Sequence, residues 1–91
     1  MDKEELLDTL AELNPDALTA DGYDAALVGI GTQLNTALAV YDWEECVEIC
    51  IKDGMEYDEA VEYMDFNVTG AYMGEGPPIF IIHKIAGGKG R

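Results

Sequence analysis

The chain of 91 residues is poor in basic side chains. Five lysines and arginines stand against nineteen aspartates and glutamates, and the formal net charge is −14. Three of the bases, Lys84, Lys89 and Arg91, fall in the last eight residues, whereas the segment from Glu4 to His83 holds eighteen acids and one base. Such a charge repels polyanions. The sequence therefore excludes direct binding to nucleic acid or to an anionic membrane surface.

The sequence also lacks a long hydrophobic run. Its longest nearly uncharged stretch, residues 25–41, is interrupted by glycines and polar residues, and no basic N-terminal segment precedes an apolar one. A membrane-spanning helix needs about 20 mostly apolar residues, and a signal peptide needs both of those parts. We expect neither a membrane span nor a secretory signal.

A complete nucleotide-binding motif is missing. The stretch AALVGIGTQ places Gly29 and Gly31 at the end of an apolar run, but no third glycine and no receiving helix follow. A phosphate cradle needs both. We interpret Gly29 as a close-packed strand position and Gly31 as part of a turn, and we expect no nucleotide cofactor.

Catalytic and metal-ligating residues are few. The single histidine, His83, and the two cysteines, Cys46 and Cys50, are the candidates for a nucleophilic pair or a zinc site. Both cysteines fall on the apolar side of an expected helix, where burial raises the thiol pKa, and a fourth zinc ligand is absent. We expect a reduced intracellular protein that is not an enzyme and has no catalytic residue, metal or cofactor.

Helical spacing of leucines marks residues 1–15. Leu6, Leu7, Leu10 and Leu13 predict an amphipathic helix, which ends at Asn14 and Pro15 because a residue before proline leaves the helical region. Two short apolar runs follow, at 25–30 and 36–41. The intervening residues 31–35 have the length of a hairpin loop, so two antiparallel strands are predicted.

Two further helices and a strand complete the pattern. Asp42 and Glu45 resemble a capping box, and Gly54 is placed to end that helix. A third helix begins near residues 56–58 and ends at Gly70 or Gly74. Its inward side is predicted to hold Tyr57, Ala60, Val61, Met64 and Val68. Residues 79–82 predict a third strand buried on both faces.

The predicted fold is a two-layer α+β domain with the order α-β-β-α-α-β. Helices pack on one face of a small, mainly antiparallel three-stranded sheet. The whole chain, 1–91, forms one domain with an N-terminal helix (1–15), an α+β core (25–83) and a flexible basic tail (84–91).

The arrangement of the acids suggests a binding surface. Neighbours three or four apart on a helix have Cβ atoms ~5–6 Å from each other, which approaches the spacing of phosphates in nucleic acid. Two acidic ridges are predicted to bind a partner, formed by Glu44, Glu45, Glu48, Asp58, Glu59, Glu62 and Asp65. A solvated face or an adaptation to high salt is the alternative. Tyr63, Phe66 and Tyr72 lie off the apolar stripe, so we expect the third helix to be buried on two sides, with an exposed aromatic patch as the alternative.

Part of the sequence resembles a family of small uncharacterised proteins of tailed bacteriophages and prophages. The resemblance covers roughly residues 21–80, and its most specific elements are Asp53-Gly54-Met55, Phe66-Asn67-Val68 and Gly70-Ala71-Tyr72. It implies a phage origin and a location in the cytoplasm of the bacterial host cell. It implies no catalytic residue.

Charge and resemblance together predict a non-enzymatic phage protein. It would bind and modulate a host protein that has a basic groove, by nucleic-acid mimicry of the anti-defence type. The alternatives are an accessory structural or assembly protein that acts as a homo-oligomer, and a small ligand-binding protein.

Overall fold

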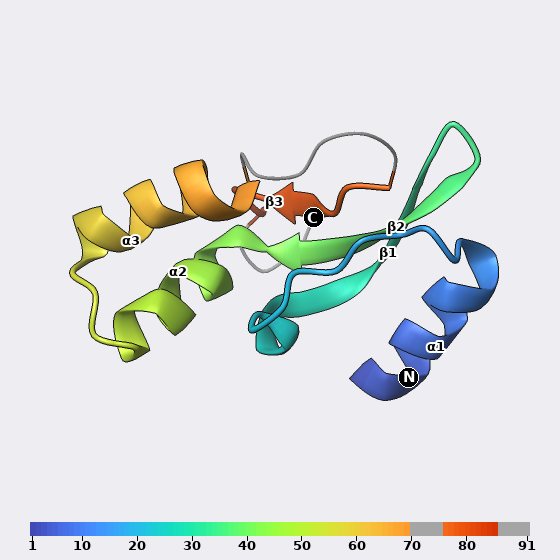
Figure 1. Ribbon diagram of the computed structural model, residues 1–91, viewed down its shortest axis with the longest axis horizontal. Coiled ribbons are helices and arrows are strands. Elements are labelled where there is room, and N and C mark those ends of the chain that lie inside the picture. Colours follow the sequence, from blue (N-terminus) through green and yellow to red (C-terminus); the bar gives the residue numbers. More distant parts are fainter. Residues whose placement is uncertain (70–75, 86–91) are drawn as a thin grey trace.

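The computed structural model describes residues 1–69 and 76–85. Its elements follow the predicted order, and the fold is α+β (Figure 1). They are α1 (Lys3–Leu13), the 3-10 turn η1 (Asp24–Ala26), β1 (Leu27–Gln33), β2 (Thr36–Asp42), α2 (Trp43–Lys52), α3 (Tyr57–Tyr63), the π-helical segment η2 (Met64–Thr69) and β3 (Ile79–Ile81). The predicted helix end at Gly70 or Gly74, the aromatic Tyr72 and the tail residues 86–91 lie outside the described residues.

β2 is the central strand of a mixed sheet of three strands in the described part of the chain. It pairs antiparallel with β1 and parallel with β3. The antiparallel pairing runs from Leu27 opposite Tyr41 to Gln33 opposite Thr36, with a bulge between Leu27 and Gly29. The parallel pairing is shorter and involves the end of β2. The longer pairing is therefore the predicted antiparallel hairpin, and a parallel edge strand is added to it.

The prediction that the third strand is buried on both faces is wrong. Ile79, Phe80 and Ile81 are half-buried, and Ile82 lies beyond the strand and is exposed. The physical reason is position in the sheet, since β3 pairs with β2 alone among the described strands. Phe80 is held by its neighbour Tyr41, with the two ring centroids 5.6 Å apart.

The hairpin turn is tighter than predicted. β1 continues through residues 31–33, and the connection consists of Leu34 and Asn35, whose φ angles are 51° and 68°. Two-residue turns with positive φ at both positions match the twist of the strands they join. The turn itself contains no glycine, and the sequence pattern therefore placed the start of the loop at Gly31, before the observed turn.

Gly29 is a strand residue as predicted, but the closely packed glycine is Gly31, which was predicted to lie in a turn. A Cβ at Gly31 would lie 3.1 Å from Val40 Cγ2 and 3.5 Å from Ile79 Cδ1, so Gly31 is the closely packed position. A Cβ at Gly29, beside the bulge, would meet no heavy atom within 4 Å. Both glycines are strand residues, and neither lies in a phosphate-binding turn.

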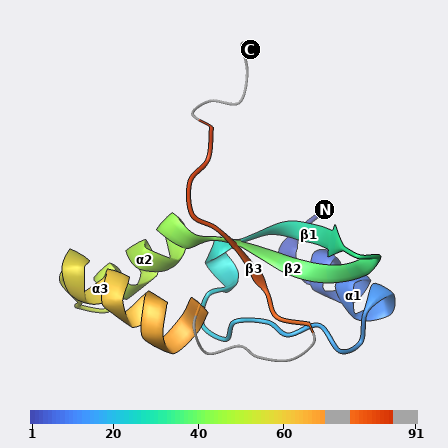
Figure 2. The same ribbon diagram turned by 90° about the horizontal axis from the view of Figure 1, so that it is seen from above.

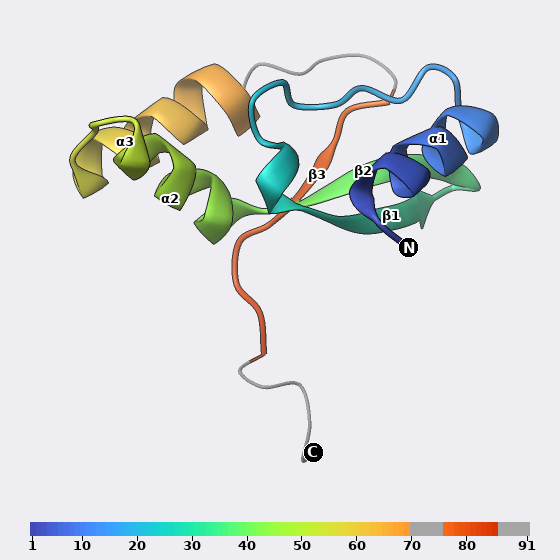
Figure 3. The same cartoon turned by 90° about the horizontal axis from the view of Figure 1, so that it is seen from below.

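α1 covers one face of the hairpin, as the two turned views show (Figures 2 and 3). Asp2 caps the helix, because its Oδ1 accepts the Glu5 N–H at 2.8 Å while its own N–H donates to Glu5 Oε1 at 3.1 Å. At the other end, the side-chain amide of Asn14 donates to the carbonyl oxygen of Ala37 at 2.9 Å. Leu10 is the residue of this helix that is fully buried, while Leu13 is exposed against the prediction.

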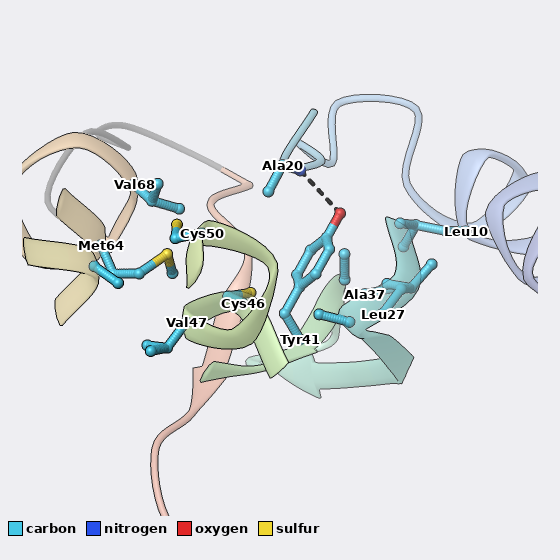
Figure 4. Close-up of a cluster of buried hydrophobic side chains, with 13 residues drawn as sticks. Leu10, Ala20, Leu27, Ala37, Tyr41, Cys46, Val47, Cys50, Met64 and Val68 are labelled. Carbon is cyan, nitrogen blue, oxygen red and sulfur yellow. Dashed lines mark hydrogen bonds between the residues drawn. The ribbon is translucent and has the colours of Figure 1, made fainter. Parts of the chain in front are cut away.

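Tyr41 links the two halves of the core (Figure 4). Its side chain is completely buried, and its hydroxyl accepts the backbone N–H of Ala20 at 2.8 Å. Leu10, Leu27 and Ala37 lie on the α1 side, and the sulfur-rich cluster of Cys46, Val47, Cys50, Met64 and Val68 belongs to α2 and η2. The bond to Ala20 fixes the long loop after α1 against the sheet.

α2 and α3 lie side by side beyond the carboxyl end of β2 rather than over a sheet face (Figure 1). α2 starts where predicted, since Asp42 Oδ1 accepts the N–H groups of Glu44 and Glu45 at 3.0 and 3.3 Å. Gly54 follows it with a φ of 109°, the left-handed conformation predicted for its end. The two helices therefore form a hairpin that projects from the sheet.

Two aromatic assignments in the third helix are wrong. Tyr57 was expected inside, but 61% of it is exposed because the helix begins there and packs through Ala60 and Met64. Two-sided burial of the aromatic residues does not occur, since Phe66 is 76% exposed and Tyr63 is also exposed. η2 winds as a π-helix, so its side chains have a different angular spacing from those of an α-helix. The buried face of this third helical segment is therefore narrower than predicted.

Candidate protein-binding surface

The three glutamates predicted on α2 lie on its outer side. Glu44, Glu45 and Glu48 are exposed, whereas Cys46 and Cys50 are buried against the core. This separation follows from the helical period, which places apolar residues three or four apart on one face. The side chains of all three glutamates therefore reach solvent.

The four predicted acids of the third helix are also exposed. Asp58, Glu59 and Glu62 belong to α3, and Asp65 belongs to η2. Because α2 and α3 contact each other, both acidic sets lie on one helical pair. We call the seven residues of these two sets the acidic surface.

A groove joins part of the acidic surface to two aromatic side chains. It is lined by Trp43, Glu44, Glu45, Val47 and Glu48 of α2 and by Tyr57 of α3. The structure thus brings the three α2 glutamates together in one site, and it leaves Asp58, Glu59, Glu62 and Asp65 outside that site. Trp43 and Tyr57 were not predicted to line a site, because both fall on apolar positions of their helices, a pattern typical of core residues.

Asp42 has a second role that the sequence did not indicate. Its side chain is 4% exposed, and its Oδ2 accepts a hydrogen bond from the ammonium group of Lys84. Together with the N–H groups of Glu45 and Glu44, this bond holds the pKa of Asp42 below its usual value against the opposing effect of burial. The carboxylate is therefore ionised at neutral pH and fixes the residues after β3 to the start of α2.

Lys84 is held by negative charge. The hydrogen bond to Asp42, and then the charges of Asp42, Glu44 and Glu45, raise its pKa above the usual lysine value. About half of the Lys84 side chain stays exposed. The first basic residue of the predicted tail is thus bound to the protein body.

The two cysteines are buried and chemically quiet. Burial, followed by the charge of Asp42, raises the pKa of Cys46 to about 12. Cys50 shares a hydrogen bond of 3.4 Å with the hydroxyl of Tyr23, whose pKa is raised mainly by burial. A thiolate is needed for nucleophilic attack, so the raised pKa of Cys46 and the burial of both thiols oppose such a role.

The third member of the proposed zinc or nucleophilic group, His83, lies elsewhere. It is exposed after β3, whereas Cys46 and Cys50 are buried in the core. Within residues 1–69 and 76–85, no group of three histidine, cysteine, aspartate or glutamate side chains is arranged to hold a metal ion.

A second depression lies at the tip of the hairpin. Its walls come from the end of α1, the turn after β1 and the residues before β3, and include Asn14, Gln33, Leu34, Thr36 and Pro77. Asn14 already donates to Ala37. Among the described residues that line this depression, Asp16 is the one ionisable residue.

Comparison with known proteins gave no match to a family model, to a curated protein or to a solved structure. The phage resemblance therefore stays a prediction from the residues. In the part of the chain that the structure describes, no helix has the length and apolar character needed to cross a membrane.

Proposed function

We propose that this protein is a non-enzymatic binding protein whose acidic surface occupies a basic groove on a partner protein. The observation that carries the proposal is that all seven predicted acids are exposed, six of them on the contacting helices α2 and α3 and Asp65 on η2, which contacts α3. A surface of one charge sign raises the encounter rate with a surface of the opposite sign and repels wrong partners. The partner expected from this surface is one that normally holds DNA or RNA.

The phage resemblance supports a host protein as this partner. A nucleic-acid-handling or defence protein of the bacterial host presents the required basic groove, and occupation of that groove would block its nucleic acid. The buried thiols support a role in binding rather than in catalysis, because the residues with the most nucleophilic potential are withheld from solvent.

The test is a pull-down from bacterial lysate with a charge-neutralised control. The control carries Glu44→Gln, Glu45→Gln, Glu48→Gln, Asp58→Asn, Glu59→Gln and Glu62→Gln, all at exposed positions. We expect the natural chain to retain a nucleic-acid-binding protein at low salt, to lose it at high salt, and to release it when double-stranded DNA is added. The control should retain none of it.

Two outcomes would contradict the proposal. One is retention of the same proteins by the natural chain and by the neutralised control. The other is a captured protein that DNA does not displace, because nucleic-acid mimicry requires the two ligands to compete for one groove.

A homo-oligomer is the second candidate function, and the exposure of Phe66 favours it. An aromatic ring that is 76% exposed beside the exposed Tyr63 is the kind of residue that anchors protein contacts. Light scattering of the natural chain and of Phe66→Ser distinguishes the cases. A mass that falls to the monomer value in the variant supports the oligomer, and a monomer in both excludes it.

A further inference from the structure

The groove between α2 and α3 has walls suited to one kind of ligand. It has a volume of about 320 Å³ and is bounded by two aromatic rings, Trp43 and Tyr57, and by the carboxylates of Glu44, Glu45 and Glu48. Trp43 is half-buried and Tyr57 is mostly exposed, so both rings have surface available to a ligand. Two rings and three carboxylates in one groove distinguish it from the remainder of the acidic surface.

The carboxylate and aromatic side chains of the lining favour a cation. The faces of aromatic rings carry partial negative charge and attract cations within about 6 Å of the ring centre. The carboxylates add full negative charges, and no basic residue is among those that line the groove. The carboxylates would repel an anion, and a neutral apolar group would leave their negative charge without a counter-charge.

The lysines in the described part of the chain are engaged or placed elsewhere. Lys3 donates to the carbonyl oxygen of Leu27 at 3.2 Å, and Lys84 donates to Asp42. Lys52, the last residue of α2, does not line the groove. No lysine of residues 1–69 and 76–85 therefore lines the groove, and we assign the cation to a binding partner.

We propose that this groove binds the guanidinium group of an arginine side chain from the partner protein. A guanidinium is planar, so it stacks on an aromatic ring and at the same time donates paired hydrogen bonds to carboxylates. A lysine ammonium has no plane to stack and is more strongly hydrated. The inference rests on the proposed function, since it names the group by which the basic partner is anchored.

Trp43 is the only tryptophan of the chain, so its fluorescence reports directly on the groove. The probes are three synthetic peptides in which glycine alternates with arginine, with lysine or with citrulline, the uncharged analogue of arginine. Binding is followed by Trp43 emission and, independently, by the anisotropy of a label on the peptide. We expect the arginine peptide to change the emission and to bind more tightly than the lysine peptide, and the citrulline peptide to leave the emission unchanged.

Two pairs of variants separate the groove from the general charge. Glu48→Gln and Glu62→Gln remove the same charge from exposed positions, but only Glu48 lines the groove. Tyr57→Leu and Tyr63→Leu each remove a ring from α3, and only Tyr57 lines the groove. We expect Glu48→Gln and Tyr57→Leu to weaken arginine-peptide binding about 2- to 5-fold more than their controls do, the range that an exposed cation–π contact supplies.

The two proposals fail in different ways. Equal affinity for the arginine and lysine peptides, together with equal losses in both members of each variant pair, overturns the arginine groove and leaves the acidic surface as a general binding face. An arginine peptide that does not bind at low salt, by either readout, overturns both.

Discussion

The ammonium group of Lys84 donates to the carboxylate of Asp42, which lies forty-two residues earlier in the chain. The other oxygen of the same carboxylate caps α2. One buried side chain thus connects the end of β2, the start of α2 and the residues after β3. This relationship gives the first two predictions.

Replacing Asp42 should destabilise the fold in proportion to the bonds lost. Asp42→Ala removes the helix cap and the partner of Lys84, and we expect a loss of about 2 kcal/mol in the free energy of unfolding, the upper part of the range for caps. Asp42→Asn keeps an acceptor for the cap and should lose less. Urea denaturation followed by circular dichroism measures both, and equal stability of the two variants would contradict the assigned cap.

The contribution of Asp42 to stability should depend on pH in the acid range. Its pKa is lower in the folded protein than the reference value of 3.8, so the contribution is complete above that value and is lost as the pH falls through the folded pKa. Urea denaturation of the natural chain and of Asp42→Asn at several pH values isolates this effect from the other carboxylates. The stability difference should be constant above about pH 5 and shrink below about pH 4. If the stability difference between the two proteins grew on acidification, the pKa of Asp42 would be raised in the folded protein and not lowered.

The hairpin turn should be improved by one substitution. Leu34 is 93% exposed and has a positive φ, a conformation that costs most residues about 1–2 kcal/mol and that asparagine tolerates. Leu34→Asn should therefore raise the free energy of unfolding by about 1 kcal/mol. Leu34→Ala is the control, because it removes the apolar side chain without relieving the backbone. A similar gain in both variants would point to the exposed leucine instead.

The two strand glycines should respond differently to a valine. Gly31→Val places methyl groups against Val40 and Ile79, and overpacking of this kind costs typically 1–3 kcal/mol. Gly29→Val adds the same atoms where a Cβ has open space, so the stability should change little. Thermal unfolding of the two variants checks the order. A larger loss at Gly29 would return it to the close-packed role first expected from the sequence.

The two thiols should be unreactive while the protein is folded. Both are buried, and the pKa of Cys46 is raised to about 12, so little thiolate forms at pH 8. We expect Ellman's reagent to label neither cysteine of the native chain within an hour and to label both at once in urea. Rapid labelling of the native chain would reopen the nucleophilic role considered for Cys46 and Cys50.

Local signals in the sequence predicted the elements well. The cap at Asp42 and the left-handed Gly54 depend on neighbouring residues of the chain, and both were found where expected. The hairpin strands follow from short apolar runs, so their pairing was found while their boundaries moved by one to three residues. The loop predicted over residues 31–35 contains the turn at Leu34 and Asn35, but its first three residues belong to β1 because they pair with β2, which no local pattern indicates.

Features that depend on distant residues were not predicted. The parallel pairing of β3 with β2 and the contact of Lys84 with Asp42 join segments far apart in the chain, which no local pattern specifies. The groove was not predicted for the same reason, since Tyr57 and Trp43 line one groove only when α3 folds back along α2. The acids of the site were predicted as exposed residues because exposure follows from helical spacing, a local property.

The acidic helices occupy an unusual place in the chain, because α2 and α3 form the crossover that joins two parallel neighbours, β2 and β3. A parallel pair requires such a connection, so the segment that we propose to bind a partner is also the one that allows the last strand to reach its edge. A peptide cut out to copy these two helices would leave behind the strands that set their spacing. Inhibitors or affinity reagents derived from this protein should therefore retain the sheet.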